Sequence, residues 1–167
     1  MTRSVAASLP PFDVVAALPS YFDQEVPRDY VDLNGHMNIR HYFELGAWGP
    51  WKRMTELGMR EDYMSTGSSF FTANHHISYL SELREGERFA VHAGFAERTD
   101  KALHSVGFVL DHTHEKVACV MEIVHVHVSM ETRRATSIPD WLAGPLDAEI
   151  GSAPWVASVA NGLDLRA

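Results

Sequence analysis

The sequence predicts one α+β domain, in which an antiparallel sheet of about five strands wraps around a single long helix. Three observations support this prediction. The length of 167 residues suits one domain. Apolar residues recur at helical intervals over 39–57, and four runs of strand length follow between residues 71 and 130. Hydrophobic residues make up 46% of the chain and charged residues 22%, a mixture that can bury a core and is not that of a disordered protein.

The N-terminal part is predicted to contain one strand and then the helix. Residues 1–22 include three prolines, and we expect an irregular or partly helical extension there. A strand is expected at about Gln24–Val31, and the polar residues 32–38 should then form a turn. Asn38 is suited to cap a helix over Ile39–Leu57, because its side chain can accept a hydrogen bond from a backbone N–H.

The dipeptide Gly49-Pro50 lies inside this predicted helix. A proline in a helix interior removes a backbone donor and clashes with the preceding turn, which costs about 3 kcal/mol. We therefore predict a kink or a break at this point.

The second half of the domain is predicted to be an antiparallel meander. After a loop at about residues 58–69, short polar segments separate four apolar runs, and their lengths suit hairpin pairing. The strands are expected at Phe71–Leu80, Arg88–Glu97, Leu103–Asp111 and Lys116–Met130.

The last predicted strand has two different faces. Val124, Val126 and Val128 share one face, whereas His125 and His127 share the other. We expect the valines to lie in the core and the two histidines to lie on the outer face.

A curled antiparallel sheet around one helix is the arrangement of the hotdog fold, which we assign to residues 23–142. Residues 143–167 are rich in Gly, Pro, Ala and Ser, and we expect a tail on the surface, with one helical turn at Pro139–Leu142. Because a sheet of this kind has an open edge, we expect a homodimer or homotetramer.

The charge balance excludes several classes of function. The chain has 14 Lys and Arg against 22 Asp and Glu, a net charge of −8, which disfavours binding to nucleic acids and anionic membranes. We find no apolar run of membrane-spanning length and expect no targeting segment. Cys119 is the only cysteine, so no internal disulfide can form, and a reducing cytoplasm is the expected compartment.

A compact polar cluster lies between the first strand and the helix. Asp32 can act as a base or nucleophile, Asn34 and His36 can orient the reactants, and Gly35 permits close approach of a ligand. The free N–H groups of the following helix can stabilise a developing oxyanion. The same residues also suit a plain turn with Asn38 as its helix cap, and composition alone does not decide between these interpretations.

The run DLNGHMNIRHY, starting at Asp32, resembles a motif of acyl-CoA thioesterases of the 4-hydroxybenzoyl-CoA thioesterase type, Asp-x-x-Gly-His-(Met/Val)-Asn-x-x-x-Tyr. It is also similar to the Asp-x-Asn-x-His-Val-Asn segment of plant acyl-ACP thioesterases. The resemblance continues through ISYLSELREGERFAV and VHVSMETRRATSIPDWL, and it covers residues 24–142.

The resemblance implies hydrolysis of an acyl-CoA or acyl-ACP thioester without a cofactor or a metal. It implies that Asp32 attacks the thioester or activates water, that Asn34 and His36 are the polar groups beside it, and that Asn38 is the asparagine at the helix entry. Relatives of this type often take a further polar group from the partner subunit. The Gly49-Pro50 pair departs from the uninterrupted helix of the family, which affects the expected shape of the acyl pocket.

Substrate-binding candidates lie on both sides of this cluster. Gly35 and Tyr42 are expected near the acyl group, while Arg133 and Arg134 could bind coenzyme phosphates or form a solvated surface pair. The helix also carries an aromatic band that includes Trp48, and such bands are more often core than ligand pocket. A part that faced the pocket would suit an aryl or cationic acyl group.

Ten histidines raise the question of a metal. No HExxH motif is present, and acidic residues are not arranged around the closely spaced pairs, so we predict no metal site. The pairs are His75 and His76, His112 and His114, and His125 and His127.

Three alternatives remain beside the thioesterase. A hotdog enoyl-CoA hydratase would use a similar Asp and His, but its Asp-x-Asn-Pro-x-His motif is one residue longer. A non-catalytic acyl-CoA-binding hotdog protein would keep the fold without turnover. A metal-binding β-protein is the third. Because GxGxxG, GxxxxGK and GxSxG motifs are absent, we exclude NAD chemistry, nucleotide hydrolysis and a serine nucleophile elbow.

Overall fold

The computed structural model describes residues 9–60, 62–163 and 165. Within these residues five strands form one antiparallel sheet in the order β1-β3-β4-β5-β2, and four α-helices and two 3-10 turns surround it. The elements are α2 Phe12–Ala16, β1 Ser20–Glu25, η1 Arg28–Tyr30, α3 Ile39–Glu56, η2 Tyr63–Thr66, β2 Ser68–Tyr79, β3 Arg88–Arg98, β4 Ala102–Asp111, β5 Lys116–Ser129, α4 Asp140–Ser152 and α5 Val156–Val159.

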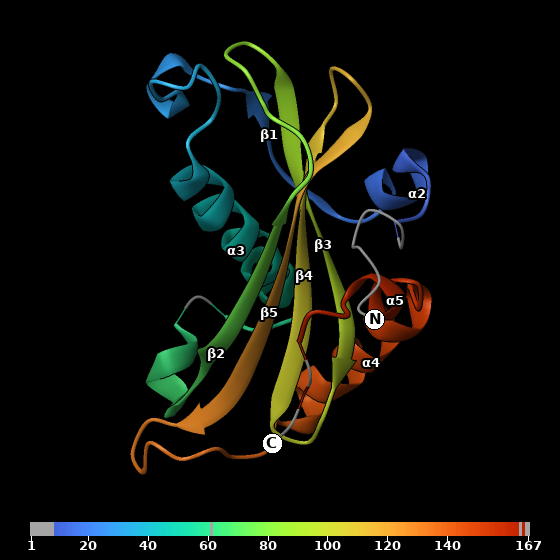
Figure 1. Ribbon diagram of the computed structural model, residues 1–167. Coiled ribbons are helices and arrows are strands. Elements are labelled where there is room, and N and C mark those ends of the chain that lie inside the picture. Colours follow the sequence, from blue (N-terminus) through green and yellow to red (C-terminus); the bar gives the residue numbers. More distant parts are fainter. Residues whose placement is uncertain (1–8, 61, 164, 166–167) are drawn as a thin grey trace.

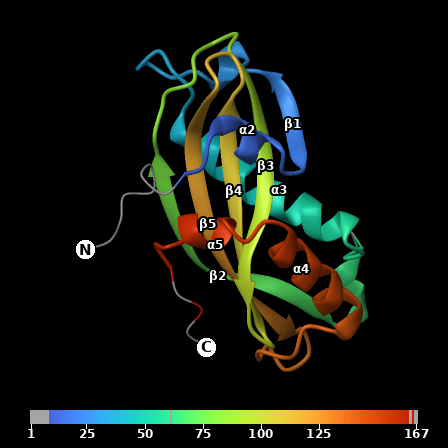
Figure 2. The same cartoon turned by 90° about the vertical axis from the view of Figure 1, so that its right-hand side faces the viewer.

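The sheet curls around α3, as the sequence predicted (Figure 1). The opposite face is covered by the short helices α2 and α5, and α4 lies along the β3 side of the sheet (Figure 2). Both faces of the central strands are therefore buried, and every residue of β4 lies in the core.

We predicted a kink or a break at Gly49-Pro50, and the break is wrong, because helix α3 is continuous through Pro50. Small residues on the face toward the sheet explain how the helix is held. A Cβ atom on Gly49 would lie 2.6 Å from Val91 Cγ1, and one on Gly46 would overlap Met121. The close contact that these glycines permit, together with the burial of Pro50, stabilises the helix against the cost of the proline.

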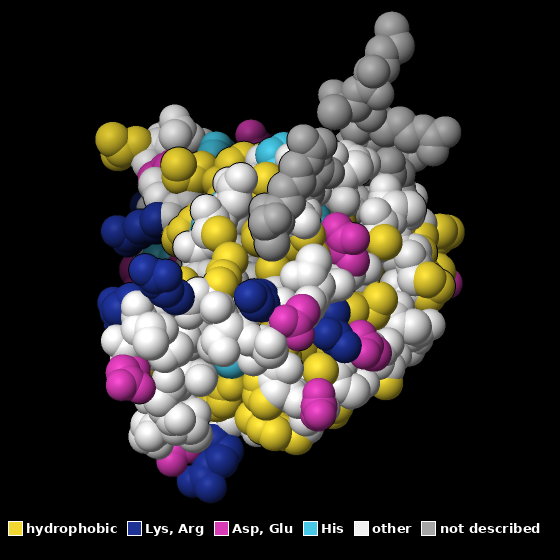
Figure 3. Space-filling model, turned by 90° about the horizontal axis from the view of Figure 1, so that it is seen from below, with side chains coloured by type: hydrophobic (Ala, Val, Ile, Leu, Met, Phe, Trp, Pro, Cys, Tyr) yellow, Lys and Arg dark blue, Asp and Glu magenta, His cyan; other side chains and the backbone are white. Residues whose placement is uncertain are grey.

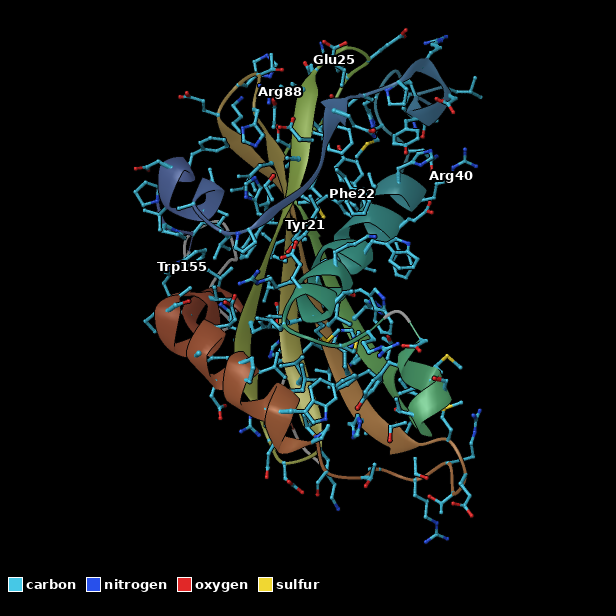
Figure 4. All side chains as sticks on the ribbon, turned by 180° about the vertical axis from the view of Figure 1, so that it is seen from behind. Tyr21, Phe22, Glu25, Arg40, Arg88 and Trp155 are labelled. Atoms are coloured by element: carbon cyan, nitrogen blue, oxygen red, sulfur yellow. The ribbon has the colours of Figure 1, made fainter. Side chains whose placement is uncertain are left out.

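The C-terminal half of α3 is also held by polar contacts. Arg53 donates to Glu149 of α4 from Nε at 2.9 Å, and its Nη1 donates to Glu56 at 2.8 Å. Tyr21 of β1, which lies against α3 in Figure 4, donates its hydroxyl hydrogen to Glu56 at 2.6 Å. Strand β1, helix α3 and helix α4 are thereby joined in one network.

Two predictions about the ends of the domain are wrong. Strand β1 begins at Ser20 instead of Gln24, and the chain after Glu25 turns at Pro27 into the 3-10 turn η1. The C-terminal segment is more regular than expected, because the predicted single turn extends into the 13-residue helix α4. Leu142 and Leu146 are four residues apart and bury one side of α4.

The predicted outward orientation of His125 and His127 is also wrong. Their exposed fractions are 5% and 2%, and they lie on the α3 side of the sheet. On the opposite face of β5, Val120 packs in one cluster with residues of α2 and α5, and Val124 and Val128 are buried as predicted. Alternation along β5 therefore separates two buried faces, and it does not separate core from water. None of the described helices is long and apolar enough to cross a membrane.

Candidate active site

The polar cluster forms a tight loop between η1 and α3. Gly35 N–H donates to the carbonyl oxygen of Asp32 at 3.0 Å, and Asp32 N–H donates to that of His36 at 3.2 Å. Gly35 has φ +82°, a left-handed conformation that glycine adopts without strain. Bridging of Val31 to Met37 closes the base of the loop. Local backbone bonds therefore shape the turn at residues 32–36.

The loop fixes the Asp32 carboxylate from two sides. Oδ1 accepts the backbone N–H of Asn34 at 2.8 Å, and Oδ2 accepts the Asn38 amide at 2.8 Å. These two hydrogen bonds, the Asn34 bond first, hold the pKa of Asp32 below its usual value. The carboxylate is therefore ionised and oriented at neutral pH.

Asn38 has two roles at this point of the chain. Its Nδ2 donates to Asp32, while its Oδ1 accepts the backbone N–H of Arg40 at 3.1 Å and caps α3. Arg40 lies at this end of the helix in Figure 4 and is exposed. A single amide thus joins the start of the helix to the orientation of the acid.

His36 and Asn34 lie beside Asp32 without a side-chain bond to it among the residues that the structure describes. His36 Nδ1 lies 3.3 Å from the carbonyl oxygen of Met37, and Nε2 lies 3.9 Å from Glu82 Oε1. Asn34 contacts the carboxylate through its backbone, and its side chain is exposed.

A cavity of about 340 Å³ opens next to the loop. The ring of Tyr42 meets that of Tyr79 edge to face, with centroids 5.6 Å apart. The Tyr42 hydroxyl accepts the backbone N–H of Leu83 at 3.0 Å, and burial raises the pKa of this hydroxyl. The cavity is lined by His36, Met37, Ile39, Tyr42, Tyr79, Leu80, Ser81 and Glu82.

Residues 79–82 are wall residues that sequence analysis missed. They line the cavity because the chain leaves β2 beside the start of α3. The Met37 N–H donates to the carbonyl oxygen of Leu83 at 2.7 Å and joins the two segments. A polar residue after a strand, such as Glu82, gives no pattern that separates a cavity wall from an ordinary loop.

A second cavity, of about 180 Å³, lies further along α3, between this helix and strands β2 and β5. We call it the aromatic cavity. It is lined by Ala47, Trp48, Trp51, Phe70, Thr72, His75, Ile123 and His125. The aromatic band of α3 is therefore divided, with Tyr42 in the core and Trp48 and Trp51 at this cavity.

Arg133 and Arg134 lie in the turn after β5. The guanidinium of Arg133 sits 4.9 Å from the centroid of the Phe71 ring. Strand β2 begins beside this turn and ends beside the Asp32 loop. Within one protomer, the two arginines and Asp32 therefore lie at opposite ends of β2. The face in Figure 3 mixes basic and acidic side chains.

The one group in the described chain with metal-ligand spacing is Glu87, Asp111 and His114. Asp111 already accepts hydrogen bonds from Thr113 N–H and from the backbone N–H of His114, and its Oδ2 lies 2.8 Å from His114 Nδ1. These contacts close the β4–β5 hairpin, so a structural role accounts for the group.

Cys119 is buried, and burial raises the pKa of its thiol to about 12. A thiolate nucleophile is therefore not available at neutral pH.

Comparisons with known proteins agree with this fold. The family model described as "Thioesterase-like superfamily" matches residues 26–146. A Ruegeria pomeroyi protein named L-carnitine dehydrogenase/betainyl-CoA thioesterase is 36% identical over 109 residues, which are 65% of this chain and 22% of that protein. The betainyl-CoA thioesterase of Pseudomonas aeruginosa is 24% identical over 115 residues, 68% of this chain and 72% of that protein. The chain thus spans about a fifth of the Ruegeria relative.

Solved structures share the fold at low sequence identity. A hypothetical Staphylococcus aureus protein solved in complex with CoA superposes with a TM-score of 0.73 at 20% identity, covering 90% of this chain and 89% of that one. The 1,4-dihydroxy-2-naphthoyl-CoA thioesterase of Synechocystis superposes with a TM-score of 0.67 at 10% identity, covering 77% and 96%.

Proposed function

We propose that this chain, which belongs to the thioesterase-like superfamily, hydrolyses the thioester bond of an acyl-CoA, with Asp32 as the reactive acid. One observation supports this most strongly. The Asp32 carboxylate is ionised and held by Asn34 N–H and the Asn38 amide before an 18-residue helix, and His36 and Met37 of the same loop line a cavity.

The start of α3 offers a binding site for the thioester carbonyl oxygen. Ile39 N–H has no hydrogen-bond partner within the described part of the chain, whereas Arg40 N–H is bonded to the Asn38 side chain. A free N–H at the positive end of a helix dipole stabilises the negative charge that develops on this oxygen. We assign Ile39 N–H as the oxyanion donor.

Two routes from this arrangement balance chemically. In one, Asp32 takes a proton from water while the water oxygen adds to the carbonyl carbon. The carbon–sulfur bond then breaks and the CoA thiolate takes up a proton. In the other, the carboxylate itself adds and expels the thiolate, and water hydrolyses the resulting anhydride. Both routes need ionised Asp32, and His36 on the cavity wall can position the water.

A homodimer completes this proposal. Strand β2 is an edge strand of the sheet, and several large apolar side chains on β2 and α3 are exposed. They are Ile39, Phe43, Trp48, Phe71 and Tyr79. Antiparallel pairing of β2 with its own copy about a two-fold axis would cover them.

This pairing would also join the two cavities. It places the Ser68 end of β2 in one protomer beside the Tyr79 end in the other. The aromatic cavity of one protomer would then face the Asp32 loop of its partner, and the turn with Arg133 and Arg134 would approach the partner's loop as well. Coenzyme phosphates near these arginines become compatible with the site only in the dimer.

The test is thiol release from a panel of short, long, aryl and cationic acyl-CoA esters, with the Asp32→Asn variant beside the wild type. Two relatives are named for betainyl-CoA, so this ester belongs in the panel. We expect turnover of at least one ester and its loss in the variant. Binding of esters without thiol release would instead assign a non-catalytic binding protein. Light scattering checks the dimer, and a monomer of 18.7 kDa with full activity would contradict it.

A further inference from the structure

We propose that the aromatic cavity binds a quaternary ammonium group carried by the acyl part of the substrate. The inference rests on the proposed thioesterase function and names the acyl class that this site selects. It comes from the shape, the rings and the charge of the cavity.

The tryptophan and phenylalanine rings that line the cavity come from two elements, α3 and β2. Trp48 and Trp51 are three residues apart on α3 and so lie on one side of the helix. Phe70 of β2 approaches from across the cavity and is buried. Its ring meets that of His125 at 84°, with centroids 6.4 Å apart. Tryptophan and phenylalanine faces attract a cation through their ring quadrupole, and quaternary ammonium groups are the ligands that such aromatic sites recognise.

The charge around the cavity leaves these rings as the main source of selectivity. None of the lining residues is Asp, Glu, Lys or Arg. Burial lowers the pKa of His125 to about 3, and burial also lowers the pKa of His75, so both rings are neutral at pH 7. An anionic acyl group would find no cation here, whereas an ammonium group meets no repulsion. A quaternary group needs no hydrogen-bond acceptor, which this wall scarcely supplies.

One residue of the cavity wall makes a fully buried polar contact, and this contact is structural. His125 Nε2 lies 2.8 Å from Ser105 Oγ, and Ser105 is fully buried in β4. This bond fixes the His125 ring as part of the wall. A Ser–His pair without an oriented acid and without access for the serine does not form a second catalytic site.

The volume limits the acyl group to a compact one. About 180 Å³ is smaller than the ~300–1,000 Å³ of sites for drug-sized ligands. A trimethylammonium group is branched and short, and it suits such a space better than a fatty acyl chain.

The distance between the aromatic cavity and Asp32 suits a short acyl group only in the dimer. Ten residues separate Asn38 from Trp48, which is about 15 Å along a helix axis. A betaine ester places its nitrogen two bonds from the thioester carbonyl carbon, so Asp32 of the same chain is too far away. The β2 pairing proposed above supplies the Asp32 loop of the partner protomer.

The test compares two esters of nearly identical shape, betainyl-CoA and its neutral isostere 3,3-dimethylbutyryl-CoA. The ratio of their kcat/KM values is measured for wild type, Trp51→Leu, Trp51→Phe and Trp48→Leu. Comparing ratios between variants cancels the intrinsic reactivity difference of the two esters. We expect each Leu variant to lower the ratio at least ~fivefold and Trp51→Phe to lower it less, since the ring face is what attracts the cation.

Trp141→Leu is the matched control, because Trp141 is half-exposed on α4 and lies outside both cavities. Its ratio should equal that of wild type. Trp48 is also half-exposed in the protomer, so Trp48→Leu should fold even if Trp51→Leu does not. Because Trp48 lies on the face that the proposed dimer covers, light scattering must show that Trp48→Leu is still a dimer. Equal losses for both esters would overturn the proposal and leave the thioesterase function intact. Failure of the wild type to release thiol from any ester would instead overturn the proposed function.

Discussion

The two halves of α3 hold sites of different construction. At its N-terminal end, the Asp32 loop is polar, and the two hydrogen bonds that orient the Asp32 carboxylate come from residues within six positions of it. Further along the helix, the aromatic cavity gathers side chains from α3, β2 and β5 that are up to 78 positions apart, from Ala47 to His125. The orientation of Asp32 depends on local hydrogen bonds, whereas the cavity depends on how α3 packs against the sheet.

This difference predicts how each region responds to mutation. Removing the Asp32 carboxylate or the Asn38 amide that holds it should change the chemistry and leave the cavity intact. Changing the residues that pack α3 against the sheet should alter the shape of the cavity, because protein interiors are dense and transmit strain.

The largest expected effect belongs to the loop. Asp32→Asn should lower kcat by at least ~100-fold with KM within a few-fold, because loss of a base or nucleophile acts on the transition state. The amide keeps the shape and removes the charge. Thermal melting must accompany the kinetics. Wild-type turnover in a variant that is merely less stable would make Asp32 a structural residue.

The dimer proposal predicts that the two regions act across the subunit boundary. Asp32→Asn and Trp51→Arg should each be nearly inactive on betainyl-CoA, the second because a guanidinium repels the ammonium group. After subunit exchange, the mixture should regain about a quarter of wild-type activity, since half of the random dimers are mixed and each holds one intact pair of loop and cavity. No recovery in mixed dimers, verified by tagged pull-down, would show that the sites are not shared.

Asn38→Ala should affect both the chemistry and the helix. It removes a hydrogen bond that lowers the pKa of Asp32, so that pKa should rise. Activity needs the ionised carboxylate, and the acidic limb of the kcat/KM profile should therefore move to higher pH. Loss of the cap should also cost about 1 kcal/mol of folding stability. If the acidic limb does not move in a folded variant, the Asn38 side chain does not control the ionisation of the catalytic acid.

The sequence predicted the regions unequally. The fold class, the helix start at Asn38 and the existence of the four later strands follow from periodicity and turn chemistry, and the structure confirms them. The predicted meander is wrong at its first strand, because β2 pairs with β5 at the edge of the sheet and β3 pairs with β1 and β4. Strand β1 was displaced because a positive φ at Phe22 and a shift in register allow pairing that short strand patterns do not predict. Helix α4 was missed because Gly144 and Pro145 hid its apolar side.

The aromatic cavity could not be predicted, because its members share no local pattern. His125 was assigned to the outer face, since alternation along a strand does not reveal that helices cover both sides. Pro50 suggested a break, since propensity does not include the packing of Gly46 and Gly49 against the sheet. The Asp32 loop, in contrast, was located from consecutive residues, although the assignment of roles within it remains a prediction.

The close packing of α3 against the sheet can be tested directly at Gly107. A Cβ atom there would overlap the backbone of Gly46, which cannot move as a flexible side chain does. Gly107→Ala should therefore destabilise the fold by ~1–3 kcal/mol, as overpacking does. Gly144→Ala is the control, because a Cβ atom there meets nothing within 4 Å. Equal melting temperatures for the two variants would contradict the seating described here.

The smallest expected effect concerns Asn34, which the family resemblance placed beside the acid. Its backbone N–H donates to Asp32 and its side chain is exposed, so Asn34→Ala keeps the hydrogen bond that lowers the pKa of Asp32. The kcat/KM value should stay within about threefold of wild type, and the acidic limb of its pH profile should move little, because the Asn34 side chain contributes least to the lowered pKa of Asp32. A tenfold loss of kcat with an unchanged limb would show that the amide contacts the substrate or the attacking water. That result would mean that the loop acts through a side chain outside its own hydrogen bonds. The difference between the locally bonded loop and the cavity formed by packing would then be smaller than the hydrogen bonds indicate.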